Sequence, residues 1–133
     1  MKSKYFKIHE LVPKAMYELK GEECWRYVPK DLIVAIDTIK ERFPKGTITI
    51  NNYNWGGDRE WSGLRTPDSP YFSQTSMHSF MMAVDMVFSA YTAEEVRQDI
   101  IKNPLTYQTI KGIELNVDWL HMDIRNIEKL LTF

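Results

Sequence analysis

The chain has 133 residues, a length that fits one domain, and we treat residues 1–133 as a single domain. Its 44% hydrophobic and 13% aromatic content is ample for a core and argues against disorder. Seventeen basic and eighteen acidic residues give a net charge of −1, so neither nucleic acid nor a charged membrane surface is expected as a partner.

Cysteine and hydropathy exclude further classes. The single cysteine, Cys24, cannot form an internal disulfide or a cysteine-based zinc ribbon, so any metal site must use His, Asp or Glu. No run of about 18 apolar residues is present, which predicts no membrane-spanning helix. Residues 1–12 mix charged and apolar side chains, which predicts cytoplasmic synthesis without a secretory signal peptide.

The first half of the chain predicts two helices and one strand. Residues 8–20 are expected to be helical, with the regular helix beginning at Pro13 and ending at Gly21. Residues 29–43 repeat apolar side chains on one face and predict a second helix. Residues 47–51 alternate and are β-branched, which predicts a strand.

Residues 52–75 have glycines and prolines typical of a loop, together with many aromatic side chains. Long aromatic-rich loops in small domains often carry function, so Trp55, Trp61 and Tyr71 are candidates for the wall of a substrate cleft. The alternative is that these rings fold back and cover the core.

The second half predicts mostly strands. Residues 81–88 are apolar except for Asp85, as in a strand buried on both faces. A capping box at Thr92 opens a helix that ends before Pro104. Further strands are expected at 111–117 and 119–125, and a short helix or strand at 126–133. Because helices and strands do not alternate regularly, we predict an α+β fold with a small antiparallel sheet flanked by helices.

The spacing of His78 and Asp85 suggests a shared site. On a helix, seven residues separate two side chains by roughly 10.5 Å of rise, which is too far for one ion. In a straight strand, an odd spacing places them on opposite faces. The two side chains can therefore meet only if His78 lies in a turn that precedes a strand carrying Asp85.

A second segment, from Asp118 to Asp123, supplies another histidine. His121 and Asp123 share one strand face, and Asp118 precedes the strand, where it can turn toward the same site. His78, Asp85 and His121 would give three N/O ligands with a fourth position open for water, as in catalytic zinc sites. Asp118, left unligated, would be the general base.

Plainer explanations exist for each residue. Each histidine taken singly is more often structural than a ligand. Asp85 in an apolar strand needs a partner because a buried unpaired carboxylate is costly. An ion pair with Arg65 or Arg125 would satisfy it without a metal.

These segments resemble a known family. The stretch Ser76-x-His78, with Ala83 and Asp85, followed by Asp118-Trp119-x-His121, resembles the zinc D-alanyl-D-alanine carboxypeptidases, which share the hedgehog/DD-peptidase fold. That family includes L-alanyl-D-glutamate endopeptidases of phage lysis systems. The segment 62–65 resembles the family's S-G-Y/L-R motif, and 50–65 resembles its small phage and prophage branch.

The resemblance implies a zinc peptidase that cuts peptidoglycan stem peptides. It implies one Zn²⁺ per chain on His78, Asp85 and His121, with Asp118 as base and Arg65 stabilising the oxyanion. Ser76, in the same motif, is expected at the substrate, and the enzyme would act on the cell wall after release, as a phage lysin does.

Two departures set up the rival hypotheses. Met81 stands where the family usually has glycine, and Asp118 replaces the commoner glutamate. The first alternative is therefore a catalytically inactive phage structural or cell-wall-binding module that keeps the fold, with or without the metal. A metal-free interaction domain is the second.

Overall fold

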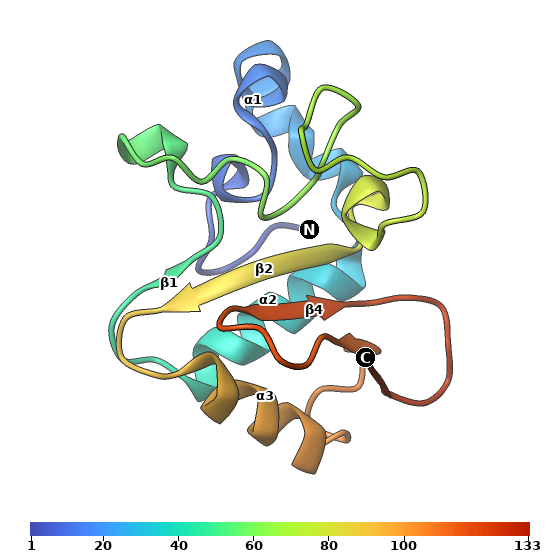
Figure 1. Cartoon of the computed structure of the whole chain (residues 1–133). Coiled ribbons are helices and arrows are strands. Elements are labelled where there is room, and N and C mark those ends of the chain that lie inside the picture. Colours follow the sequence, from blue (N-terminus) through green and yellow to red (C-terminus); the bar gives the residue numbers. More distant parts are fainter.

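A computed structural model describes residues 1–133 and has an α+β fold (Figure 1). Its helices are α1 (Lys14–Lys20), α2 (Lys30–Arg42) and α3 (Ala93–Lys102). Its strands are β1 (Ile48–Thr49), β2 (Ala83–Phe88), β3 (Gly112–Ile113), β4 (Leu120–Asp123) and β5 (Leu131–Thr132). Four 3-10 segments complete it: η1 (Ile8–Glu10), η2 (Gly21–Tyr27), η3 (Tyr53–Trp55) and η4 (Met77–Phe80).

The residues at the ends of the helices explain where each helix begins and ends. α1 begins after Pro13 and ends at Gly21, whose φ of 54° needs no Cβ. α2 begins after Pro29, and α3 is capped by Thr92, whose side-chain oxygen accepts a hydrogen bond from the Glu95 amide at 3.0 Å. Each expected helix is confirmed, although residues 8–10 form a separate 3-10 turn. None of these helices has the length and apolar character needed to cross a membrane.

The five strands form one mixed sheet in the order β1-β2-β4-β3-β5. The first three pairings are antiparallel, as expected, but β5 runs parallel to β3. The expectation of a wholly antiparallel sheet is therefore wrong at this edge. β5 differs because the chain passes β3 after β4 and pairs on its far side, a crossover that the short 126–133 segment does not reveal.

The two faces of β2 and β4 have different roles. Asp85 pairs with His121 and Ala83 pairs with Asp123, so these side chains share one face. The opposite face is wholly apolar and packs into the same core as α2, which lies behind β2 and β4 in Figure 1. The core residues on that face are Val84, Met86, Ile113, Leu120 and Met122. The sheet therefore has a core face and a face that carries the candidate site residues.

The turn between His78 and β2 depends on Met81. Met81 ends η4 in the left-handed conformation, with φ 58° and ψ 33°, and its amide bonds back to the His78 and Met77 carbonyls. Met81 is 3% exposed and lies in the core, and it does not line the cavity beside the candidate metal ligands. A left-handed residue with a Cβ costs about 1 kcal/mol, which explains why glycine would also suit this turn.

The left-handed conformation of Met81 reverses the usual order of stability, in which an alanine variant is more stable than a glycine variant. Both Met81→Gly and Met81→Ala remove the buried side chain, but only glycine removes the backbone strain, so Met81→Gly should be more stable by about 1 kcal/mol. At buried Met86, inside β2, alanine should be the more stable substitution by a similar amount. Urea unfolding of the four variants tests this, and a Met81→Ala protein at least as stable as Met81→Gly would contradict it.

Candidate metal centre

Three side chains from different elements meet on the reactive face of the sheet. His78 comes from η4, Asp85 from β2 and His121 from β4. Asp85 Oδ1 lies 3.3 Å from His78 Nε2 and 3.0 Å from His121 Nδ1. One ligand atom of each residue lies within 4.8 Å of the other two, and all three residues are buried. The turn-then-strand geometry required by the His78–Asp85 spacing is confirmed.

In each histidine, the contact of one ring nitrogen determines whether the other nitrogen, which faces Asp85, carries a proton. His78 Nδ1 lies 2.9 Å from the Gly63 carbonyl, which can only accept, so this nitrogen carries the proton. His121 Nε2 lies 3.1 Å from Asp123 Oδ2, again an acceptor. Metal-ligating histidines are held in this way, with the distal N–H donated to a carbonyl or carboxylate.

The two ring nitrogens that face Asp85 explain why a cation suits the centre. With its proton on Nδ1, a neutral His78 directs a lone pair from Nε2 at the Asp85 carboxylate, and neutral His121 does the same from Nδ1. Such acceptor–acceptor contacts require a proton or a metal ion between them. Tetrahedral bonds of about 2.0–2.1 Å separate neighbouring ligand atoms by about 3.3 Å, which is close to the two distances observed here.

Glycines at two positions admit these contacts. At Gly63 a Cβ would stand 2.2 Å from the Leu11 carbonyl oxygen, so the carbonyl that holds His78 needs glycine. At Gly112 a Cβ would stand 2.3 Å from Asp123 Oδ1, so the cross-strand glycine leaves room for that carboxylate. The geometry of both histidines therefore rests on backbone that tolerates no side chain.

The protonation of the centre follows from burial and hydrogen bonding. Burial raises the pKa of Asp85, but the hydrogen bond from His121 outweighs it and holds the pKa below its usual range. Burial lowers the pKa of His121, but hydrogen bonds to Asp123 and Asp85 outweigh it and raise the pKa to about 9. Without a metal, a proton therefore occupies the space between His121 and Asp85.

Metal binding must displace this proton, which makes zinc affinity depend on pH. Because His121 ligates only when deprotonated and its pKa is about 9, the apparent affinity should rise about tenfold per pH unit from pH 7 to about 9. Competition with a chromophoric chelator at several pH values measures this slope. A pH-independent affinity over this range would contradict the assignment of His121 as a ligand.

Of the two ion pairs considered for Asp85, the structure contains one. Arg65 Nη2 lies 3.2 Å from Asp85 Oδ2, so the expected pair with Arg65 exists and leaves Oδ1 to the histidines. Arg125 does not reach Asp85; it binds Asp123 through two nitrogens, at 2.7 and 2.6 Å. Asp85 can therefore keep its arginine partner and still offer one oxygen to a metal.

A cavity of about 420 Å³ opens onto the centre. Besides the three candidate ligands it is lined by eight residues, namely Arg65, Thr75, Ser76, Met77, Glu114, Trp119, Arg125 and Phe133. Arg65 and Ser76 are therefore placed at the centre. Ser76 also caps η4, where its Oγ accepts a hydrogen bond from the His78 amide at 3.3 Å.

The remaining candidate residues lie elsewhere. Asp118 is exposed and lines a separate concavity, so the structure does not bring it to the cavity with the histidines. Trp55 is 63% exposed and packs on His9. Trp61 contributes only its carbonyl, which accepts from Arg65 Nε at 2.8 Å, and the Tyr71 ring lies 5.6 Å from the Arg65 guanidinium. The aromatic side chains of the 52–75 loop thus do not line this cavity.

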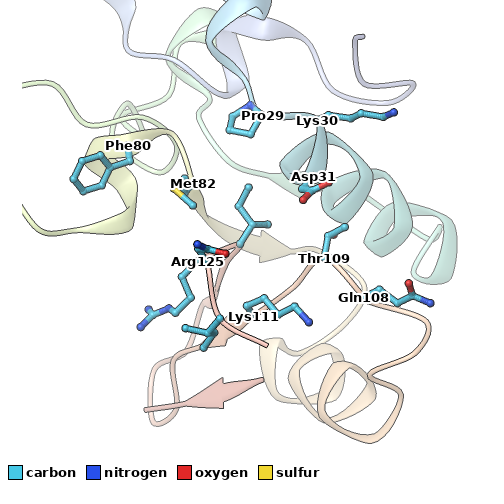
Figure 2. A pocket seen from close by; sticks show the side chains of 12 residues that line it. Pro29, Lys30, Asp31, Phe80, Met82, Gln108, Thr109, Lys111 and Arg125 are labelled. Atoms are coloured by element: carbon cyan, nitrogen blue, oxygen red, sulfur yellow. The ribbon is translucent and has the colours of Figure 1, made fainter. Parts of the chain in front are cut away.

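More spacious concavities lack this chemistry. Figure 2 shows one of about 720 Å³ between the start of α2, the end of η4 and the segment after β4. Its lining includes one carboxylate, that of Asp31, together with Lys30 and Lys111, and no histidine. We assign the site to the smaller cavity because metal ligands converge only there.

Three residues at the centre were not given a role by sequence reasoning. Asp123 is fully buried behind His121, and Glu114 and Phe133 line the cavity. The Phe133 ring packs edge-on against His121 at 5.8 Å and lies 4.8 Å from the Arg125 guanidinium. Strand parity already placed Asp123 beside His121, so this signal was available; Glu114 and Phe133 depend on cross-strand register.

Comparison with known proteins adds no assignment. No protein-family model, curated protein or solved structure matches this chain.

Proposed function

We propose that the chain is a zinc-dependent peptidase that hydrolyses peptidoglycan stem peptides. The observation that carries the proposal is the buried convergence of His78, Asp85 and His121 at a cavity. Three N/O ligands with an open side are the arrangement of catalytic zinc. The substrate class, at a D-Ala-D-Ala or L-Ala-D-Glu bond, and the hedgehog/DD-peptidase fold rest on the resemblance of the 62–85 and 118–121 motifs.

The proposed roles follow from the contacts. Zinc held by these ligands would lower the pKa of a bound water toward about 7 and so supply a nucleophile at neutral pH. Asp123 and the Gly63 carbonyl orient the two rings. Arg65 is fixed by the Trp61 carbonyl and by Asp85, and it lines the cavity, where its remaining N–H donors can stabilise a developing oxyanion.

Purified cell walls test the proposal. Wild-type protein with zinc should release peptides bearing new amino termini or free D-alanine, and mass spectrometry of the products identifies the bond. The His78→Ala variant and a chelated sample should release neither. The matched control is His9→Ala, which changes a buried histidine outside the centre and should retain activity. Wild-type protein that binds zinc but releases nothing would refute the peptidase.

A second candidate function is favoured by the position of Asp118. Because this expected base lies outside the cavity, the chain can instead be a cell-wall-binding module that keeps the metal without turnover. It then predicts zinc-dependent cosedimentation with cell walls and no released product. The same incubations distinguish the two functions, since pellet and supernatant are both measured.

A further inference from the structure

The cavity holds a carboxylate that the spacing of motifs does not single out. Glu114 follows β3, and its amide donates to the His121 carbonyl at 3.4 Å. Gly112, two residues earlier, pairs with Asp123. Strand alternation therefore puts Glu114 on the face that carries His121 and Asp123, and its side chain lines the cavity with the candidate ligands.

A buried arginine fixes the loop that follows. Arg97 of α3 is 2% exposed and donates hydrogen bonds to the carbonyls of Glu114, Val117 and Trp119, at 3.0, 2.9 and 2.8 Å. These three anchors determine which loop side chains face the cavity. Glu114 and Trp119 do so, whereas Asp118 lines the other concavity.

Glu114 also differs from the other carboxylates at the centre in its partners. Asp85 is paired with Arg65, and Asp123 is paired with Arg125. Glu114 has no ion-pair partner, whereas each of the two arginines that line the cavity is paired with an aspartate. Its oxygens are therefore available to a water or a substrate, whereas those of Asp85 and Asp123 are committed to holding the histidines and arginines.

We propose that Glu114, not Asp118, is the general base of the hydrolysis; this inference rests on the proposed peptidase function. Glu114 takes a proton from the attacking water as the water oxygen bonds to the carbonyl carbon of the scissile peptide. The C–N bond then breaks, and Glu114 returns the proton to the leaving nitrogen. Peptide and water become a carboxylic acid and an amine, and Glu114 ends the cycle as a carboxylate.

The test compares two substitutions that remove charge with little change in shape, Glu114→Gln and Asp118→Asn. Both variants should retain the wild-type zinc content. Glu114→Gln should lower kcat on a stem peptide by at least about 100-fold with little change in KM. Asp118→Asn should stay within about threefold of the wild-type kcat. The inference would be overturned by the reverse pattern or by equal effects in both variants. It would also be overturned by loss of zinc in Glu114→Gln, because Glu114 would then be a ligand.

A second readout does not require turnover. In Co²⁺-loaded protein the visible spectrum reports ionisation at the metal as pH rises. Removing the Glu114 charge should move the midpoint of this change down by on the order of one pH unit, whereas Asp118→Asn should leave it in place. If the wild type cleaves no peptide, the proposed function fails, but this shift still tests whether Glu114 lies beside the metal. An unchanged midpoint in Glu114→Gln would overturn that placement.

Discussion

Replacing Asp123 with alanine is expected to weaken zinc binding by about 10- to 100-fold. Asp123 is fully buried, and its Oδ2 accepts from His121 Nε2 at 3.1 Å and from Arg125 Nη2 at 2.6 Å. Without this carboxylate, the His121 ring loses the contact that fixes its tautomer and orientation. Chelator competition at pH 7.5 measures the affinity.

The same substitution should destabilise the metal-free protein by about 3–5 kcal/mol, since it leaves the Arg125 guanidinium without its partner beside a buried site. Burial raises the pKa of Asp123, but hydrogen bonds from Arg125 and His121 outweigh it and keep the group ionised, so the lost partner is a charged one. Urea unfolding measures this cost.

Asp99 provides the matched control. It also binds an arginine through two oxygens, in this case Arg42, at 2.9 and 2.8 Å, but it lies on α3 and the pair is more exposed. Asp99→Ala should therefore leave zinc affinity unchanged and cost less stability than Asp123→Ala. Wild-type zinc affinity in Asp123→Ala would contradict the role assigned to Asp123.

Arg97→Met should be strongly destabilising, by about 3–5 kcal/mol, because several carbonyls lose a donor that is worth about 1–3 kcal/mol each. The substitution keeps a long side chain but removes the donors to the carbonyls of Glu114, Val117 and Trp119. Carbonyls that lose a donor in a buried setting cost more than the net value of the bonds themselves. Equilibrium urea unfolding measures the loss.

Zinc binding separates this effect from general unfolding. The three candidate ligands lie outside the 114–119 loop, so folded Arg97→Met should still bind zinc. Arg42→Met, which removes a more exposed guanidinium from the Asp99 pair, should cost less. An Arg97→Met protein whose free energy of unfolding lies within about 1 kcal/mol of the wild type would show that the loop does not depend on this arginine. Surface substitutions usually have effects below this threshold.

Spacing and parity predicted the centre well where local geometry decides it. The seven residues between His78 and Asp85 required a turn followed by a strand, which is what η4, Met81 and β2 form. Strand parity likewise predicted that His121 faces the reactive side. Both inferences need only the period of a strand.

The positions of Asp118, Glu114 and Trp55 depend on non-local structure. Asp118 lies in a loop, where parity does not apply, and the loop's conformation is set by Arg97 from a different helix. Glu114 reaches the cavity because β3 pairs with β4 in one particular register. Trp55 packs on His9 of the distant η1 segment instead of the cleft. No pattern within a short window encodes these contacts.

The zinc content of the purified protein decides whether His78, Asp85 and His121 hold a metal ion. Wild-type protein, His78→Ala and His9→Ala would be purified without added chelator and analysed for zinc by elemental analysis. We predict close to one zinc per chain in the wild type and in His9→Ala, where the changed histidine is buried but outside the centre. We predict none in His78→Ala. A wild-type protein without metal after incubation with zinc, or equal zinc in all three proteins, would contradict a metal site at these three residues.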